Sequence, residues 1–253
     1  MRALYCGYRI EFRSELHKMQ GTHPLLGKNL LVITAHPDDE SYVLAGTLAA
    51  NAKAGGRTIL VCATCGEKGI SHLQRPMSAQ SLARRRKQEL KAACAKLGVQ
   101  HLSICMVPDG QVERHTKAFT RAILQVCKNF TPDVVLSFGP CGITGHRDHV
   151  AAGRVARRVA RQLHVPFAAA VLSPKLQRDA KRFLASRRHA LHYHPTTEFV
   201  SPNLTIRIDA KTKQRALRCH MSQMDGGRLF TGFPKYVVQG LLHREYFRVW
   251  KRS

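Results

Sequence analysis

The chain has 253 residues, of which 44% are hydrophobic, enough to bury the core of one α/β domain. No apolar stretch approaches the roughly 20 residues that cross a bilayer, and charged side chains interrupt the first 28 residues. These features exclude a transmembrane segment and a secretory signal, so we expect a cytoplasmic protein with reduced cysteines. The net charge of +25 favours an anionic surface or a nucleic acid as one partner, with a merely solubilising surface as the alternative.

Apolar runs and amphipathic stretches alternate along the chain. In chain order we expect strand 29–35, helix 41–54, strand 57–64, helix 78–97, strand 101–106, helix 114–129, strand 133–138 and helix 147–163. Weaker patterns predict strands at 167–172 and 204–208 and a helix at 213–224. This alternation predicts an α/β fold: a Rossmann-like, doubly wound, mostly parallel sheet with helices on both faces.

The domain organisation expected from this pattern is simple. Residues 1–28 precede the first clear strand and are expected to form an N-terminal extension, with 29–253 as a single domain. Met19 is an alternative start of the native protein. The sequence leaves the oligomeric state open, including a homo-oligomer.

Two clusters of histidine and carboxylate follow two of the expected strands. His36, Asp38, Asp39 and Glu40 come directly after the first, and the segment 145–149, which reads Gly-His-Arg-Asp-His, follows the fourth. Burying so much charge is costly unless a cation or a reaction uses it. Because ligands bind beyond the carboxyl ends of parallel strands, we expect the two clusters to form one site.

The residue types suit a catalytic zinc ion, which takes three protein ligands and leaves one position open. His36 and Asp39 supply two ligands from one loop, and His149 or His146 supplies the third. Asp38 is placed to accept a proton from water, and His146, with a carboxylate two residues away, to protonate a departing amine. The structural alternative is that His36 braces a turn and that Asp38 or Asp39 caps the following helix.

The same two segments, 35–40 and 142–149, resemble the two signatures of the LmbE-like, or PIG-L, family of zinc-dependent de-N-acetylases. Further stretches fit the family in the right order: 64–69, 86–90, 97–99, 108–110 and 216–223. The resemblance covers roughly residues 29–225. One departure is Arg147, where the family usually has proline, which places a cation near the pocket mouth.

The resemblance implies roles for matching residues. His36, Asp39 and His149 would hold one zinc ion per chain, or another divalent transition metal. Asp38 would be the general base and His146 the general acid, oriented or tuned by Asp148. Arg86 and Asp109 would contact the sugar-like substrate. Outside these roles, Glu40 and Glu67 are expected to brace loops, and His220 either approaches the site or packs inside the protein.

The function that these residues favour is hydrolytic removal of an N-acetyl group from an N-acetylglucosamine-type sugar or conjugate, a small molecule. One alternative is an amidase acting on a larger thiol or sugar conjugate. The other is a non-catalytic basic protein that binds nucleic acid or an anionic surface. A complete set of ligands, base and acid argues against this last class.

Overall fold

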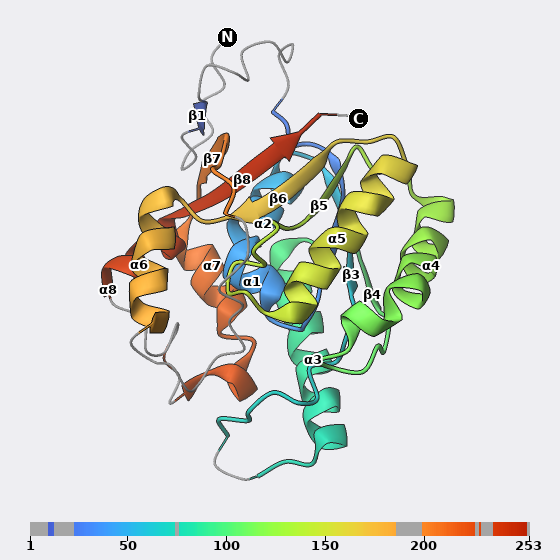
Figure 1. Cartoon of the computed structure of the whole chain (residues 1–253), viewed down its shortest axis with the longest axis vertical. Helices are drawn as coiled ribbons and strands as arrows, with labels where there is room; N and C mark the ends of the chain where they lie inside the picture. Colours follow the sequence, from blue (N-terminus) through green and yellow to red (C-terminus); the bar gives the residue numbers. More distant parts are fainter. Residues whose placement is uncertain are drawn as a thin grey trace.

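The computed structural model of the protein describes residues 10–12, 23–73, 76–185, 199–225, 228 and 235–251. Within these residues the strands are β1 (Ile10–Phe12), β2 (Asn29–Thr34), β3 (Arg57–Cys62), β4 (His101–Ile104), β5 (Val134–Phe138), β6 (Phe167–Val171), β7 (Leu204–Arg207) and β8 (Arg244–Trp250). They form one eight-stranded sheet in the order β1-β7-β8-β6-β5-β2-β3-β4 (Figure 1). The α-helices are α1 (Asp39–Val43), α2 (Ala45–Lys53), α3 (Ala79–Leu97), α4 (Thr116–Val126), α5 (Arg147–Gln162), α6 (Pro174–Ala185), α7 (Ala210–Leu217) and α8 (Lys235–His243).

The sheet has a parallel part and an antiparallel edge. Strands β6, β5, β2, β3 and β4 run parallel, and β8, β7 and β1 pair antiparallel. The parallel strands are joined through helices, as the alternation in the sequence predicts. The expected doubly wound, mostly parallel architecture is therefore confirmed.

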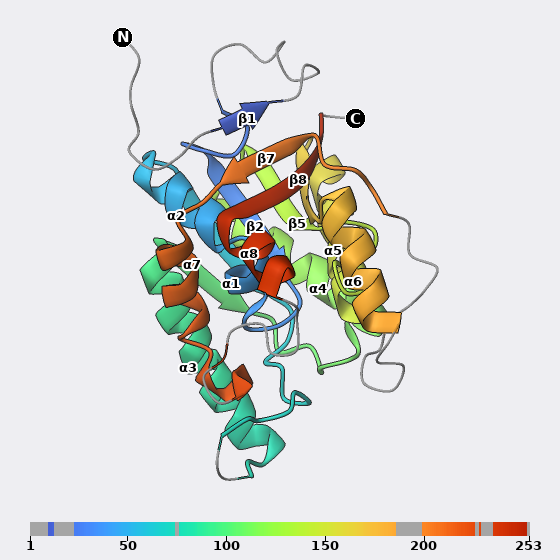
Figure 2. The ribbon, with the colours of Figure 1, turned by 90° about the vertical axis from the view of Figure 1, so that its left-hand side faces the viewer.

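Helices cover both faces of the sheet. On β2, Leu30 and Val32 belong to one apolar core, shared with α2, α3 and α7. Leu31 and Ile33 point the other way into a second core, shared with α4 and α5. The four positions 30–33 are all apolar because both faces of the strand are buried there. Figure 2 shows the sheet between α2, α3 and α7 on one side and α5 on the other.

The helix expected at 41–54 is two helices, α1 and α2, interrupted at Leu44. The second helix has its own cap, because the carboxylate of Glu245 accepts hydrogen bonds from the backbone N–H groups of Gly46 and Thr47 at 3.0 and 2.8 Å. These are among the N–H groups that a helix start leaves without an internal partner. The capping carboxylate lies 198 residues from Thr47, so no local pattern shows the interruption.

Three further observations bear on the expectations. Leu25, inside the expected extension, is fully buried in the core, so packing begins upstream of residue 29. The cysteines of the described residues are all free thiols. Among the helices of the described residues, none combines the length and apolar character needed to cross a bilayer. Met19 lies outside the described residues.

Candidate metal centre

The two histidine and carboxylate clusters meet at the carboxyl edge of the parallel strands. The first follows β2 and the second follows β5, and these strands are hydrogen-bonded neighbours. On its other side β2 pairs with β3, so the chain order reverses at this point in the sheet. Such a reversal opens a crevice in which ligands of doubly wound proteins bind.

Three potential ligand atoms from the two loops face one another. His36 Nδ1 lies 3.1 Å from His149 Nε2, which lies 3.1 Å from Asp39 Oδ1. Zinc–ligand bonds of about 2.0–2.2 Å put neighbouring ligand atoms of a tetrahedron roughly 3.4 Å apart. A hydrogen bond between the two imidazole nitrogens uses one proton, and a cation between them can take the place of that proton. The donor set therefore fits a zinc-like ion.

The carboxylate of Asp39 is fixed from both sides. Its Oδ2 accepts hydrogen bonds from the backbone N–H groups of Ala35 and His36, at 2.9 and 2.8 Å, which leaves Oδ1 for His149 and the metal position. Burial alone would raise the pKa of Asp39, but the charge and hydrogen bond of His149 and the charge of His36 hold it well below its usual range. The group is therefore a carboxylate at any physiological pH.

The other nitrogen of His36 faces two carboxylates. His36 Nε2 lies 3.2 Å from Asp109 Oδ1 and 3.3 Å from Asp148 Oδ2. Although burial opposes it, hydrogen bonds to Asp109 and Asp148 raise the pKa of His36 to about 10. A carboxylate on this nitrogen keeps a proton there, so Nδ1 is the nitrogen that would give up its proton to a metal.

Asp148 thus has a place that the sequence did not indicate. Besides His36, its carboxylate accepts hydrogen bonds from the backbone N–H groups of Gly110 and Val112, at 2.7 and 3.0 Å. We expected this carboxylate to orient or tune His146. The structure shows in addition that it contacts His36. This contact arises because the loop after β4 packs across the start of α5, which local spacing does not reveal.

His149 is oriented by its surroundings in a similar way. Its Nδ1 donates to the carbonyl oxygen of Gly142 at 2.9 Å, and its ring stacks on Phe138 with centroids 4.3 Å apart. A Cβ on Gly142, whose φ is +59°, would lie 2.8 Å from His149 Cβ. The glycine therefore permits both the turn and the close approach that leave Nε2 free for a metal.

His146 borders the same position. One nitrogen from each of His36, His146 and His149 falls within 4.8 Å of the other two. Burial and the nearby charges of His36 and His149 lower the pKa of His146 to about 4, although Asp148 acts to raise it. The carboxylate of Asp148 alone would raise the pKa of His146, but burial and the charges of the other histidines outweigh it and lower that pKa.

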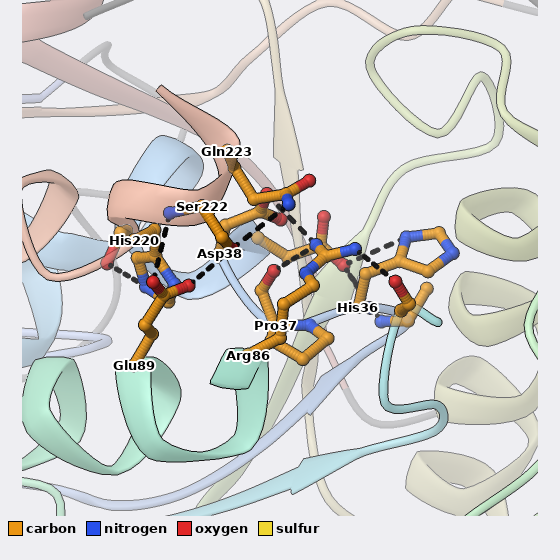
Figure 3. A network of polar contacts seen from close by, with 12 residues as sticks. His36, Pro37, Asp38, Arg86, Glu89, His220, Ser222 and Gln223 are labelled. Carbon is orange, nitrogen blue, oxygen red and sulfur yellow. Dashed lines mark hydrogen bonds and ion pairs between the residues drawn. The ribbon is translucent and has the colours of Figure 1, made fainter. Parts of the chain in front are cut away.

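Asp38 sits beside the ligands in a backbone conformation that is unusual for a residue other than glycine, with φ at +110°. Its carboxylate pairs with the buried guanidinium of Arg86 at 3.1 Å, and Arg86 also donates to the carbonyl oxygens of Gly66 and Pro37 (Figure 3). Burial raises the pKa of Asp38 against the opposing charge of Arg86. A carboxylate with a raised pKa suits a general base.

The two glutamates expected to brace loops do so. Glu67 Oε1 accepts a hydrogen bond from the backbone N–H of Asp109 at 2.7 Å. Glu40 is fully buried, accepts a hydrogen bond from the backbone N–H of Asp38 at 3.1 Å, and lies 2.7 Å from His220 Nε2. His220 therefore belongs to the interior beside the site.

This fold and this donor set define the class: doubly wound α/β proteins with a candidate metal centre at the carboxyl edge of the sheet. The family model described as "GlcNAc-PI de-N-acetylase", PIG-L, matches residues 31–160. The chain belongs to the PIG-L family. It is therefore related to hydrolytic deacetylases.

Individual relatives agree with the family. The chain is 30% identical to a 1D-myo-inositol 2-acetamido-2-deoxy-alpha-D-glucopyranoside deacetylase of Nakamurella multipartita, over 87% of this chain and 88% of the relative. It is 30% identical to a probable N-acetyl-alpha-D-glucosaminyl L-malate deacetylase 2 of Bacillus anthracis, over 66% and 80%. The N,N'-diacetylchitobiose deacetylase of Pyrococcus horikoshii has the same fold, with a TM-score of 0.62, 21% identity and coverage of 88% and 84%.

Proposed function

We propose that this protein is a zinc-dependent hydrolase that removes the acetyl group from the nitrogen of an N-acetylglucosamine-type sugar or conjugate, acting in the cytoplasm. The observation that carries the proposal is the mutual approach of His36 Nδ1, His149 Nε2 and Asp39 Oδ1, with 3.1 Å between successive atoms. The names of the relatives support N-acetylglucosamine as the acetylated part of the substrate. The group attached to the sugar differs between the relatives, but the acetylated glucosamine is shared.

His36, Asp39 and His149 would hold the ion. When bound, zinc supplies a Lewis acid and lowers the pKa of water. Asp38, with its raised pKa, accepts the proton from the attacking water. Nδ1 of His146 accepts a hydrogen bond from the backbone N–H of Asp148 at 3.2 Å, so the neutral ring carries its proton on Nε2. As the general acid, His146 would pass this proton to the departing amine and recover the proton that Asp38 took from water. Acetate and the free amino sugar are the products.

The proposed contacts of Arg86 and Asp109 with the sugar stay predictions. In the structure both side chains are largely buried, and they contact Asp38 and His36 respectively. We therefore propose that they chiefly hold the base and one metal ligand in place. A substrate variant series would separate this role from direct binding, because direct contacts change KM for one sugar more than for another.

The test is release of acetate and amine from a set of N-acetylated glucosamine conjugates by zinc-loaded protein. The matched variant is Asp38→Asn, which keeps the shape of the side chain and the metal ligands. We expect it to retain zinc and to lose about 10²–10⁴-fold in kcat, the usual contribution of a positioned acid or base. Unchanged turnover would show that Asp38 is not the base.

The competing functions predict other outcomes. An amidase for larger conjugates would release amine from those conjugates and not from N-acetylated sugars. A non-catalytic basic protein would bind nucleic acid or an anionic surface in a salt-dependent way, would keep that binding in His36→Ala, and would have no amidase activity.

A further inference from the structure

His220 is a buried histidine that takes no part in the candidate metal centre. It follows α7, is 1% exposed, and lies in the same polar network as Asp38 and Arg86 (Figure 3). Its Nε2 contacts Glu40 Oε1 at 2.7 Å. A buried ion pair of this kind is poor evidence for stability by itself, so its place beside Asp38 calls for an explanation.

Three consecutive carboxylates each have a different partner. Asp38 pairs with Arg86, Asp39 with His149, and Glu40 with His220, at 3.1, 3.1 and 2.7 Å. This division keeps three negative charges apart in a space where each would otherwise raise the pKa of its neighbours. His220 is thus one of the groups that orient the carboxylate of Glu40.

The carboxylate of Glu40 links His220 to the backbone of Asp38. One oxygen contacts His220 Nε2 and accepts a hydrogen bond from Ser41 Oγ at 2.6 Å. The other oxygen accepts a hydrogen bond from the backbone N–H of Asp38 at 3.1 Å. That backbone is in the left-handed region, with φ at +110°, which a residue with a side chain holds only when its surroundings fix it.

His220 is itself anchored to the helix that carries Arg86. Two residues later, the backbone N–H and Oγ of Ser222 donate to the two oxygens of Glu89, at 2.9 and 2.6 Å. Glu89 lies three residues after Arg86 on α3. Helix α3 thus fixes both supports of Asp38: Arg86 at its carboxylate and, through the segment of His220, Glu40 at its N–H.

We propose that His220 is a positioning residue, which acts through Glu40 to hold Asp38 in the conformation that its role as general base requires. This inference rests on the proposed function. Without the donor at position 220, the buried Glu40 carboxylate keeps only the hydrogen bonds from Ser41 and Asp38 among the described residues, and it lies beside two other carboxylates. It then turns away from its present position, which weakens its hold on the N–H of Asp38.

The variants isolate this link. His220→Leu removes the donor, and His220→Gln keeps an N–H where Nε2 stands. The control is Lys213→Met, which breaks another buried ion pair on the same α7, with Glu245 at 3.1 Å, a residue outside the network of Asp38, Glu40 and His220 described above. Melting temperatures then show how much of any effect follows from lost stability alone.

The first measurement does not depend on activity: hydrogen exchange of the Asp38 amide, followed by NMR in the metal-free protein. We expect exchange to be at least about tenfold faster in His220→Leu, close to wild type in His220→Gln, and unchanged in Lys213→Met relative to its global stability. An Asp38 amide that exchanges equally fast in His220→Leu and wild type overturns the proposal, whatever the enzyme does.

The second measurement is turnover by the zinc-loaded protein. Because a displacement of about 1 Å costs roughly 10²-fold in rate, we expect His220→Leu to lower kcat by about that factor. KM and zinc content should stay within about threefold, and His220→Gln should recover most of the rate. In an Asp38→Asn background, His220→Leu should cause no further loss, since it acts through Asp38.

The outcomes separate the two proposals. A further fall in kcat in the Asp38→Asn background, or a loss in His220→Leu no greater than in Lys213→Met, contradicts the positioning role. Wild-type protein that releases no acetate, together with the expected change in Asp38 exchange, contradicts the proposed function and leaves the structural link intact.

Discussion

The protein buries charge in two regions that differ in one respect. The carboxylate of Glu245 on β8 is surrounded by donors: Lys213 Nζ, two backbone N–H groups and the hydroxyl of Thr47, all within 3.1 Å. At the candidate metal centre, the nitrogens of His36 and His149 instead face each other. The donors of the first region are all supplied by the chain, whereas the second region presents a set of ligand atoms that fits a cation. A buried charged group therefore indicates a metal site only where potential ligand atoms face one another without enough donors from the protein.

The largest effect is expected from a substitution at the candidate metal centre. His149→Ala removes one of three ligand atoms, so metal content should fall to background and turnover with it. The metal-free variant should lose less stability than Lys213→Met does, because the ligand loops are arranged for an ion and not for each other. Metal analysis after zinc reconstitution and thermal unfolding of the metal-free proteins check both parts.

Lys213→Met tests the first region. It leaves the Glu245 carboxylate buried without its cation, and breaking a buried pair in this way costs about 3–5 kcal/mol. We expect the lower end of that range, because the N–H groups of Gly46 and Thr47 remain. Zinc content and kcat per folded molecule should not change. Adding Glu245→Gln should restore part of the stability, and a stable single variant would contradict the comparison.

Asp148→Asn examines the support of the metal ligands. The amide keeps the size of the side chain but no longer holds a charge against His36 Nε2, 3.3 Å away. Loss of such a partner lowers metal affinity by about 10–100-fold. Competition with a zinc chelator measures the change. If affinity is unaltered while kcat falls, Asp148 acts on His146, as the sequence suggested, and not on His36.

The smallest effect concerns the start of α7, the helix that precedes His220. Asp209 caps it by accepting hydrogen bonds from the side chain of Thr212 and from the N–H groups of Lys211 and Thr212, and the bond from the Thr212 side chain is the main cause that lowers the pKa of Asp209. Asp209→Ala should cost about 1 kcal/mol at neutral pH.

The pH dependence of this difference follows from the sign of the shift. A carboxyl group with a lowered pKa in the folded state stabilises the protein above its ordinary pKa and loses that contribution as pH falls through the folded value. Chemical denaturation of Asp209→Ala and wild type should therefore converge in acid. A constant difference down to low pH would rule out the carboxylate as the cap.

The sequence predicts the parallel part of the sheet well, because strands buried on both faces are continuously apolar and the intervening helices are amphipathic. It did not predict β8, whose burial alternates along the strand. The inward position held by Glu245 breaks the apolar alternation that would identify the strand. In the sequence, a buried glutamate that pairs with a distant lysine cannot be distinguished from an exposed glutamate.

For the candidate site too, the sequence predicts one part and leaves another unpredicted. The residues proposed as ligands, base and acid lie in short segments at strand ends, where spacing and residue type point to them. The contacts of Asp109 and Asp148 with His36, and of His220 with Glu40 across 180 residues, depend on how distant loops pack. No local pattern encodes these contacts, and the roles expected of Asp109 at the sugar and of Asp148 at His146 stay predictions.

The most direct test of the account is zinc binding by the purified, metal-free protein, measured by calorimetry at neutral pH alongside His149→Ala. The account predicts one zinc ion per wild-type chain, bound with release of a proton from His36, and none in the variant. A wild-type chain that binds no divalent ion after reconstitution, or binds it equally well without His149, would contradict the claim that these loops form a metal centre.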